Sequence, residues 1–353
     1  MFFLNKNLIS FDIGASSIKM VEVLGKKGKE IKKIDYEMLP AGAVVSGMIE
    51  NMDQVSAAMA NLASKNKILL KQRFCALSIG GSPLVVRRSV FPKIEDDIFE
   101  QVELEAGQHF QFDLEELHIE HEVQDAYKTD QGTPVLICGA KMEVVQSYVD
   151  VAVGLGMQVA VVDSDILCLV NLFESLYPQA DGLNAIVNVG ASGATVILTY
   201  GTHFLFSRDI PSGGIYYTEQ ISSQLSMSVE EAESIKIASM SGGTSPDLMR
   251  VLNELNDQLV QEIEQCIEFY FQSGDAPPNL NQVQRFFLSG GGSVVLGLDA
   301  AIANRMRGEV ILLDPFQNRK FKSGKDRDKG SELRHIYGVT AGLSLRTYKD
   351  DVD

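Results

Sequence analysis

The chain has 353 residues, of which 45% are hydrophobic, and this content is enough to build the cores of two or three domains. Its 31 Lys and Arg residues against 47 Asp and Glu residues give a formal net charge of −16, which repels nucleic-acid phosphates and argues against a nucleic-acid partner. The sequence has neither a signal peptide nor an apolar run of the roughly 20 residues that a transmembrane helix needs, so we expect a cytoplasmic protein without a transmembrane segment.

A strand closed by a glycine turn is predicted over residues 8–22, and the same pattern recurs 176 positions later. The segment VNVGAS of residues 187–192 aligns with FDIGAS of residues 11–16. Glycine lets a turn bring its backbone N–H groups close to an anion, and the nearby serines and Lys19 add donors suited to phosphate oxygens. Two ordinary hairpins would use the same residues, but the recurrence favours two related half-domains that each carry a phosphate-binding turn.

After the first turn, the pattern predicts a long hairpin over residues 19–39 with its tip at 25–29. Apolar residues at helical spacing then predict a helix over 53–64, and residues 73–79 read as a strand. This strand ends at a Gly-Gly-Ser-Pro turn over 80–83.

The composition changes from residue 84 to about residue 154. Eleven acidic residues and no Lys or Arg lie between Glu95 and Glu122. The pattern of strand, helix, strand, strand and helix predicts a small inserted subdomain with its own core. We interpret the acidity as a solvated face, which a basic partner could also use.

The second half of the chain begins with a helix after residues 163–165 and continues with the second glycine turn. A strand over 204–210 runs into a turn that contains Gly213 and Gly214. A capping box starts the next helix, over 229–238, whose pair Glu233 and Lys236 reads as an exposed intrahelical ion pair. A long amphipathic helix follows from Ser245-Pro246 to about residue 273, and residues 275–279 form a loop.

A third glycine-rich segment follows the strand over 285–288, where the triple glycine 290–292 offers bare backbone to a ligand. It is not a dinucleotide-binding fingerprint, because that motif requires glycine at the position of Val295. Residues 318–329 are rich in Lys and Arg, and we interpret them as a mobile loop that could alternatively touch anionic lipid or an acidic partner. The last helix, over 331–346, carries small residues that allow close packing beneath the first turn.

In this order, the motifs resemble the PilM family of type IV pilus assembly proteins, which belongs to the actin-like ATPase superfamily with FtsA and MreB. The resemblance extends over nearly the whole chain and rests on FDIGASSIKMVEV, VVDSDILCL, VNVGASGATVIL, GGIYYTEQI, VEEAESIK, FFLSGGGS and GVTAGLSLR. It implies an α/β, actin-like (ribonuclease H-like) fold of duplicated domains with a small α+β insert in the first domain. The expected boundaries are 1–82, 158–184 and 331–353 for domain I, 83–157 for the insert, and 185–330 for domain II with a helical subdomain at 212–284.

The resemblance also implies ATP and Mg²⁺ as cofactors. Asp12 would hold Mg²⁺ through water, because this ion keeps much of its hydration shell, and Asp165 would be the tentative catalytic residue that orients the attacking water. The nucleotide would be bound by residues of all three glycine-rich segments and of one helix, namely Asp12, Gly14, Ala15, Ser16, Ser17, Lys19, Asn188, Gly190, Ala191, Ser192, Gly213, Gly214, Glu233, Lys236, Gly290, Gly291 and Gly292.

Asn188 departs from the family pattern, since relatives that hydrolyse ATP usually have an aspartate there. An amide hydrogen-bonds a metal-bound water but lacks the negative charge that balances Mg²⁺ and cannot act as a base. Because phosphoryl transfer depends on charge placement, we expect ATP to be bound and turned over slowly or not at all.

The resemblance further implies a partner, since members of this family bind the cytoplasmic N-terminal peptide of PilN, an inner-membrane protein, between the insert and the first domain. The expected function is therefore a cytoplasmic adaptor that reaches the inner membrane through PilN and other pilus components. Two alternatives remain within the superfamily, an FtsA-like cell-division scaffold and a small-molecule kinase. The short acidic end of the chain does not resemble the amphipathic membrane helix expected of the scaffold.

Overall fold

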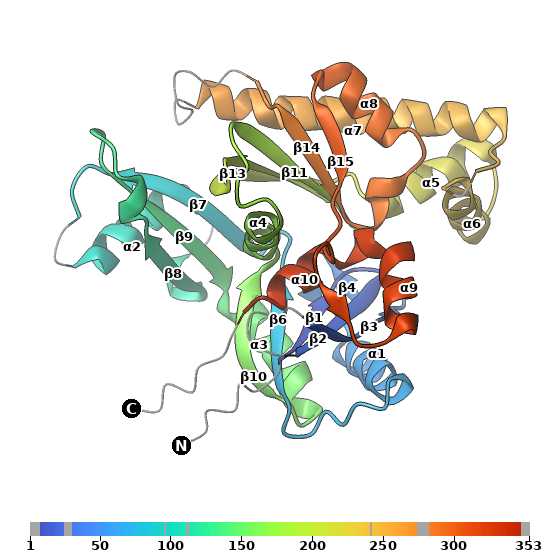
Figure 1. Cartoon of the computed structure of the whole chain (residues 1–353), viewed down its shortest axis with the longest axis horizontal. Helices are drawn as coiled ribbons and strands as arrows, with labels where there is room; N and C mark the ends of the chain where they lie inside the picture. Colours follow the sequence, from blue (N-terminus) through green and yellow to red (C-terminus); the bar gives the residue numbers. More distant parts are fainter. Residues whose placement is uncertain are drawn as a thin grey trace.

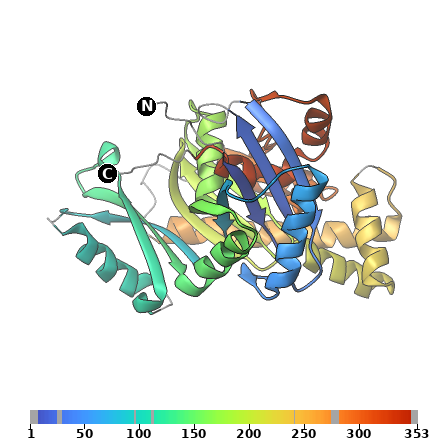
Figure 2. The same ribbon diagram turned by 90° about the horizontal axis from the view of Figure 1, so that it is seen from below.

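The computed structural model of the chain describes residues 8–24, 30–94, 97–110, 113–240, 242–273 and 282–346. Two lobes, each built on a sheet, lie one above the other, and a smaller sheet extends to one side (Figure 1). Seen from below, this smaller sheet lies at one end of the molecule and the helices of residues 214–239 lie at the other (Figure 2). The predicted turns at 25–29 and 275–279 fall outside the described residues.

The first sheet has the strand order β10-β6-β1-β2-β3-β16. Strand β1 pairs antiparallel with β2 and parallel with β6. One face of the sheet is covered by α1 and α3, and their shared core contains Phe11, Met59 and Tyr148. The strands are β1 (Ile9–Ile13), β2 (Ser17–Leu24), β3 (Glu30–Met38), β6 (Phe74–Ile79), β10 (Gln158–Ser164) and β16 (Lys320–Phe321), and the helices are α1 (Met52–Lys65) and α3 (Met142–Gly154). A short hairpin precedes α1, and its strands, β4 (Val44–Val45) and β5 (Met48–Ile49), have two residues each.

The second sheet has the order β13-β12-β11-β14-β15 and repeats the pairing of the first sheet, except that β16 has no counterpart. In each sheet a glycine turn joins the first antiparallel pair, and the next strand of the sheet adds in parallel to the other side of the first. The strands are β11 (Leu183–Val189), β12 (Ala194–Tyr200), β13 (His203–Ile210), β14 (Arg285–Ser289) and β15 (Glu309–Leu312). The predicted duplication is therefore confirmed.

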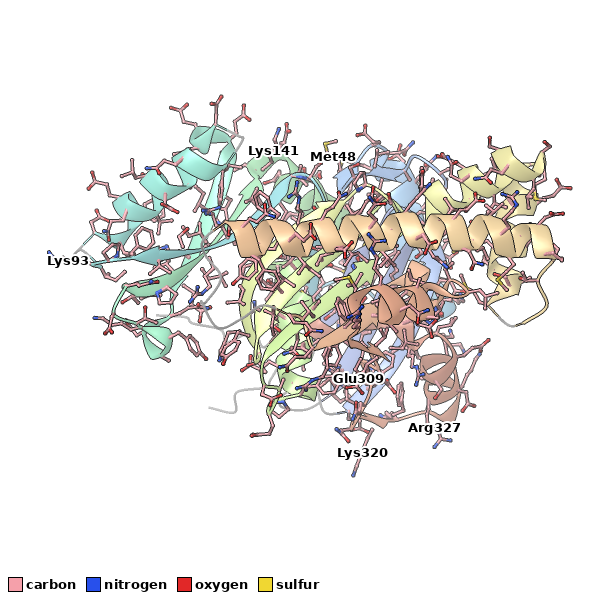
Figure 3. All side chains as sticks on the ribbon, turned by 90° about the horizontal axis from the view of Figure 1, so that it is seen from above. Met48, Lys93, Lys141, Glu309, Lys320 and Arg327 are labelled. Atoms are coloured by element: carbon pink, nitrogen blue, oxygen red, sulfur yellow. The ribbon has the colours of Figure 1, made fainter. Side chains whose placement is uncertain are left out.

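Helices cover the outer face of the second sheet. The longest of them in the described residues, α7 (Pro246–Gln272), crosses the whole lobe (Figures 1 and 3) and buries one apolar stripe against the sheet, as its sequence predicted. The others are α5 (Gly214–Leu225), α6 (Val229–Ser239) and α8 (Leu298–Met306), with a 3₁₀ turn η4 (Gly291–Val294). No helix among the described residues is long and apolar enough to cross a membrane.

Two short helices lie between the lobes, α4 (Asp165–Leu176) and α10 (Gly338–Leu343). Together with the inner faces of both sheets they form a single core, in which Ala76 of β6 and Ile186 of β11 take part. The prediction of close packing by small residues is confirmed, because a Cβ on Gly342 would lie 1.9 Å from the carbonyl oxygen of Cys168. The preceding residues do not extend this helix, since Arg334–Tyr337 form a 3₁₀ turn, η5.

The side sheet has the order β7-β9-β8. It is formed by β7 (Leu84–Phe91), β8 (Leu117–Val123) and β9 (Thr133–Lys141), with α2 (Ile98–His109) and the 3₁₀ turns η2 (Leu114–Glu116) and η3 (Asp125–Tyr127). Its core contains Phe91, Val102 and Ile137. Helix α3, which the sequence analysis assigned to this core, instead buries Val144 and Tyr148 against the first sheet. Helical periodicity identified the buried face of α3 but not the surface that it meets.

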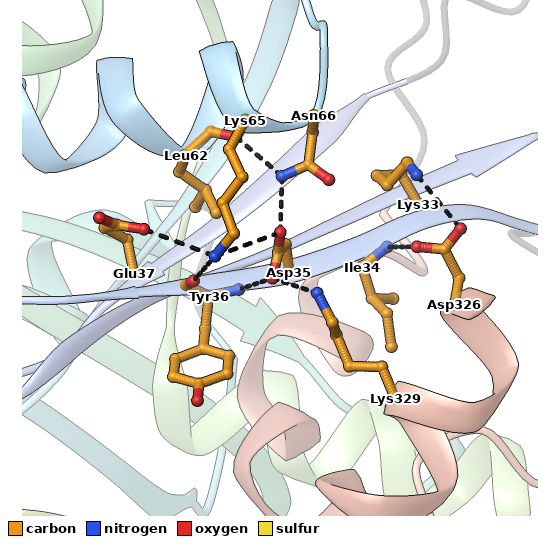
Figure 4. A network of polar contacts seen from close by, with 10 residues as sticks. All are labelled: Lys33, Ile34, Asp35, Tyr36, Glu37, Leu62, Lys65, Asn66, Asp326 and Lys329. Carbon is orange, nitrogen blue, oxygen red and sulfur yellow. Dashed lines mark hydrogen bonds and ion pairs between the residues drawn. The ribbon is translucent and has the colours of Figure 1, made fainter.

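The structure corrects the prediction of a loop over the basic segment 318–329. Its residues form β16, which pairs with β3, and the start of α9 (Gly324–Glu332), which packs on β3. Asp326 is buried, accepts a hydrogen bond from the backbone N–H of Ile34 at 3.4 Å and pairs with Lys33 at 3.3 Å (Figure 4). A second ion pair joins Lys329 to Asp35. Two acidic residues on different elements thus dock a segment that looked solvated because of its charge.

The pairing of Asp35 predicts a dependence of stability on pH. Burial by itself raises the pKa of Asp35, but hydrogen bonds from Lys329 and Asn66 outweigh burial and leave the pKa below the usual 3.8. The ionised carboxylate therefore stabilises the fold fully above the unfolded pKa, and this contribution is lost as the pH falls through the lower folded value. We expect Lys329→Met to lower the free energy of unfolding by about 1–3 kcal/mol at pH 7 and to flatten this acid dependence, as measured by urea unfolding.

The matched control is Lys322→Met, which removes an exposed lysine of the same segment and should change stability by no more than about 0.5 kcal/mol. Equal effects of the two substitutions would contradict the docking role of Lys329.

Candidate functional site

The two glycine turns have the same backbone geometry. The N–H of Gly14 donates to the carbonyl of Ser17 at 3.1 Å, and at the equivalent position Gly190 donates to Gly193 at 2.8 Å. Four N–H groups at matching positions make no hydrogen bond within the described residues, namely those of Ala15, Ser16, Ala191 and Ser192. Successive unpaired N–H groups in a turn form a concave site for an anion, so each turn presents such a site.

The first turn carries an ion pair beside its free N–H groups. Asp12 and Lys19 lie opposite each other in the β1–β2 register, and their charged atoms are 3.3 Å apart. The lysine crosses the turn closely, since a Cβ on Gly14 would come within 2.9 Å of its Nζ. Ser17, in contrast, is buried within β2. Lys19 thus brings a positive charge to the turn, and Asp12 a negative one.

The second turn is fixed to the start of α5. The N–H groups of Gly214 and Ile215 donate to the carbonyls of Gly190 and Ala191, both at 2.9 Å. Gly213 has no room for a side chain, because a Cβ would lie 2.4 Å from the nitrogen of Gly193. The sequence predicted the turn before α5, but this contact with the second glycine turn is a result of the tertiary structure.

Glu233 and Lys236 form the predicted ion pair at 2.7 Å, but the pair is not the exposed one that we expected. Lys236 is 5% exposed and donates to the carbonyl of Gly214 at 2.8 Å and to the hydroxyl of Thr218 at 2.7 Å. Thr218 in turn hydrogen-bonds Glu233. This buried network holds α6 against the start of α5 and places its charges beside the second turn.

The triple glycine lies against the same turn. Gly290 has a φ of +88°, and a Cβ there would lie 2.3 Å from the carbonyl oxygen of Val189 and 2.8 Å from the amide oxygen of Asn188. A glycine is required at 290 for both reasons. Gly292 is buried, and a Cβ on it would lie 2.5 Å from the side chain of Val189, whereas Gly291 is exposed.

Asp165 lies at the first position of α4, between the lobes. Its carboxylate accepts a hydrogen bond from the N–H of Ile166 at 2.7 Å and occupies the space that a Cβ on Gly80 would need. Burial among the surrounding atoms raises its pKa well above the usual value, and the charges of Asp209 and Asp12 raise the pKa further. One carboxylate from each lobe therefore raises the pKa of Asp165, which lies at the start of a helix between the lobes.

Asp209 is a candidate that the sequence analysis missed. Asn188, Thr195 and Asp209 lie opposite one another on neighbouring strands, so their side chains share the inner face of the second sheet. The hydroxyl of Thr195 donates to Asp209 at 2.7 Å. The protein around Asp209 removes part of its hydration and raises its pKa, although the residue keeps an open side toward solvent.

The sequence signal for Asp209 was an acidic residue at the end of a predicted strand, just before the Pro-Ser-Gly-Gly turn. The residues that lie beside Asp209 are decided by the pairing of β12 with β13. The register of this pairing shifts between Leu198 and Thr199. Within the described residues, no group of three or more His, Cys, Asp or Glu side chains is arranged to ligate a metal directly.

Comparison with known proteins relates this arrangement to one family. The family model described as type IV pilus assembly protein PilM matches residues 10–348. A solved PilM-PilN type IV pilus biogenesis complex contains a chain with a TM-score of 0.84 and 20% identity, and the match covers 97% of this chain and 99% of that one.

Two further solved structures share the fold at lower similarity. The ethanolamine utilization protein EutJ from Carboxydothermus hydrogenoformans has a TM-score of 0.58 and 12% identity, with 96% of this chain and 89% of that chain covered. MreB 5 of Spiroplasma citri bound to AMPPNP has a TM-score of 0.56 and 12% identity, with 97% and 96% covered. These likenesses confirm the expected actin-like fold.

The contact between Gly213 and the second turn predicts the result of a substitution. We expect Gly213→Ala to lower the free energy of unfolding by about 1–3 kcal/mol, because its Cβ forces the turn and α5 apart. Urea unfolding measures the change. The control is Gly154→Ala, where a Cβ meets nothing within 4 Å, and equal stability of the two variants would contradict the close contact.

Proposed function

The chain belongs to the type IV pilus assembly protein PilM family, and we propose that it is an ATP-binding adaptor of the pilus assembly machinery. The observation that carries the nucleotide part of this proposal is the pair of matching turns with their free N–H groups at residues 15, 16, 191 and 192. Free backbone donors from two lobes suit the phosphates of one nucleotide, bound between the lobes.

The remaining residues of the cleft fit the same ligand. Lys19 would pair with phosphate oxygens in place of part of its contact with Asp12, and Asp12 would then hold a hydrated Mg²⁺. The backbone of Gly213, Gly214 and the triple glycine would lie along the nucleotide, while Glu233 and Lys236 would border it on the side of α6. When bound, Mg²⁺ supplies positive charge that offsets the phosphate charge.

Asn188 gives the second turn less negative charge than the aspartate that ATP-hydrolysing relatives usually have there. This supports slow turnover of ATP or none. We propose that Asp209 partly replaces the missing carboxylate. It lies two strands from Asn188 on the same face and is oriented by the hydroxyl of Thr195. Its negative charge would attract the hydrated cation from the side of the second lobe. Asp165 would orient the attacking water from the side of the first lobe.

This proposal predicts that Asp209 contributes to cation-dependent binding. We expect Asp209→Asn to weaken ATP binding about tenfold, ~1.4 kcal/mol, in the presence of Mg²⁺ and to leave binding in EDTA unchanged, since the carboxylate acts through the cation. Titration calorimetry with and without Mg²⁺ measures both affinities.

The control is Asp257→Asn, an exposed carboxylate on α7, which should leave both affinities unchanged. Asn188→Asp provides the converse test: it should raise ATP turnover above that of the wild type, which we expect to stay below about one per second. An Asp209→Asn variant with the full Mg²⁺ dependence of the wild type would rule out the role of Asp209.

We further propose that the chain binds the cytoplasmic N-terminal peptide of a PilN-like inner-membrane protein, and thereby lies at the inner membrane while remaining cytoplasmic. Support comes from the family and from the nearly complete match to the PilM chain of the solved PilM-PilN complex. The resemblance to the family places the expected binding region between the insert and the first lobe. Leu84 and Val86 of β7, the first strand of the insert, belong to the core between the lobes. Nucleotide binding in the cleft could reach the insert through this core.

The coupling predicts two different affinities for one peptide. Calorimetric titration with a synthetic N-terminal PilN peptide should give dissociation constants that differ at least about fivefold between the ATP·Mg²⁺ form and the nucleotide-free form. Lys19→Ala should keep peptide binding but remove the difference, since it removes a proposed phosphate contact at the first turn and none in the insert. No binding in either form would eliminate the adaptor function, and equal affinities would eliminate the coupling.

A further inference from the structure

A polar cavity of about 310 Å³ lies between β3, the end of α1 and α9. None of its residues belongs to the glycine turns or to the triple glycine. Five lysines and two aspartates contribute to its wall, and Figure 4 shows most of them around the docked α9. Cavities of this volume are at the lower end of the range for small-molecule sites, about 300–1,000 Å³.

The two aspartates are buried and already satisfied by the protein. Asp35 is 2% exposed and accepts hydrogen bonds from Asn66 at 2.8 Å, from the N–H of Tyr36 at 3.0 Å and from Lys329. Asp326 is 3% exposed and is held by the N–H of Ile34 and by Lys33. Their charges are therefore compensated from within the wall.

The lysines exceed what these two carboxylates need. Glu37 beside the cavity also pairs with Lys65, at 3.7 Å, so five positive charges face three negative ones and leave a local charge of +2 in a chain whose net charge is −16. Lys65 pairs with Asp35 at 3.6 Å, as a second cation on that carboxylate. Within the described residues, the side-chain ammonium groups of Lys67 and Lys325 form neither a hydrogen bond nor an ion pair, and both side chains are exposed at the cavity.

Lys67 occupies a position that local structure alone would give to another residue. It follows the C-cap Asn66 of α1 and has a φ of +57°. Helices commonly end with glycine or asparagine in this left-handed conformation, which costs other residues about 1–2 kcal/mol. A lysine at this position places a positive charge both at the C-terminal end of the helix dipole and at the mouth of the cavity.

We propose that this cavity binds a phosphate-bearing anion. Lysine is a compact charge with three donors, so Lys33, Lys65 and Lys329 can each hold a buried carboxylate and still donate to a ligand. Because these contacts already restrict the three side chains, a ligand pays less conformational entropy to order them. Lys67 and Lys325 supply the charge that has no partner in the protein.

The phosphate could belong to a soluble molecule or to a lipid headgroup. The cavity lies next to the basic segment, where Lys320 and Arg327 extend from the edge of the molecule (Figure 3). A lipid headgroup would present the phosphate on a membrane surface, whereas a soluble ligand would reach the cavity from solution. The chemistry of recognition is the same, and the source is decided by experiment.

The first arm of the test is calorimetric titration of the full chain with inorganic pyrophosphate. The double variant Lys67→Glu/Lys325→Glu should weaken binding at least tenfold. The matched control Lys320→Glu/Lys322→Glu reverses the same number of charges in the same region, outside the cavity wall, and should weaken it less than threefold. Binding of pyrophosphate to the glycine turns is unaffected by either pair, so failure of the nucleotide proposal does not alter this comparison.

The second arm is cosedimentation with phosphatidylcholine vesicles, with and without phosphatidylglycerol. Loss of phosphatidylglycerol-dependent sedimentation in the cavity variant alone supports a lipid headgroup as the source. A cavity-dependent effect with pyrophosphate alone supports a soluble ligand. If the cavity variant and the control behave alike toward both probes, the cavity is not an anion site and the proposal is wrong.

Discussion

The close contact between α10 and α4 is the constraint on which the rest of the structure depends. Gly342 touches the backbone of Cys168 so closely that even a methyl group has no space. The two helices are the middle layer of a core that takes residues from the inner faces of both sheets. Because one core joins the lobes, this contact fixes how the two sheets lie relative to each other, and carboxylates of both lobes raise the pKa of Asp165.

Acidic groups lie in two different environments in this molecule. At β3, Asp35 and Asp326 are buried and have cationic and backbone partners supplied by the chain itself, and the carboxylates dock a helix. Asp165 and Asp209, in contrast, form no ion pair with a cation of the described residues, and their pKa values are raised. A carboxylate that loses hydration without gaining a positive partner has a raised pKa, because its charged form is disfavoured.

The comparison with EutJ and MreB illustrates why fold and function need separate arguments. Chains with only 12% sequence identity still share the duplicated architecture. This architecture supports many functions. The features that carry the proposals for this chain are local: an asparagine at position 188, an aspartate two strands away, and a lysine-rich cavity beside α9. Each of these features involves residues that are distant in sequence, and so its meaning depends on which elements the fold brings together.

The sequence by itself determined the features that depend on short-range conformation. The repeated glycine turns, the capping box of Ser228 and Glu231, and the apolar stripe of α7 follow from glycine geometry, capping and helical periodicity, and the structure confirms all three. The tertiary structure alone decided where α3 packs, why Lys236 is buried and which carboxylate accompanies Asn188. The reason is physical: periodicity shows that a face will be buried, but strand register and long-range packing decide what it is buried against.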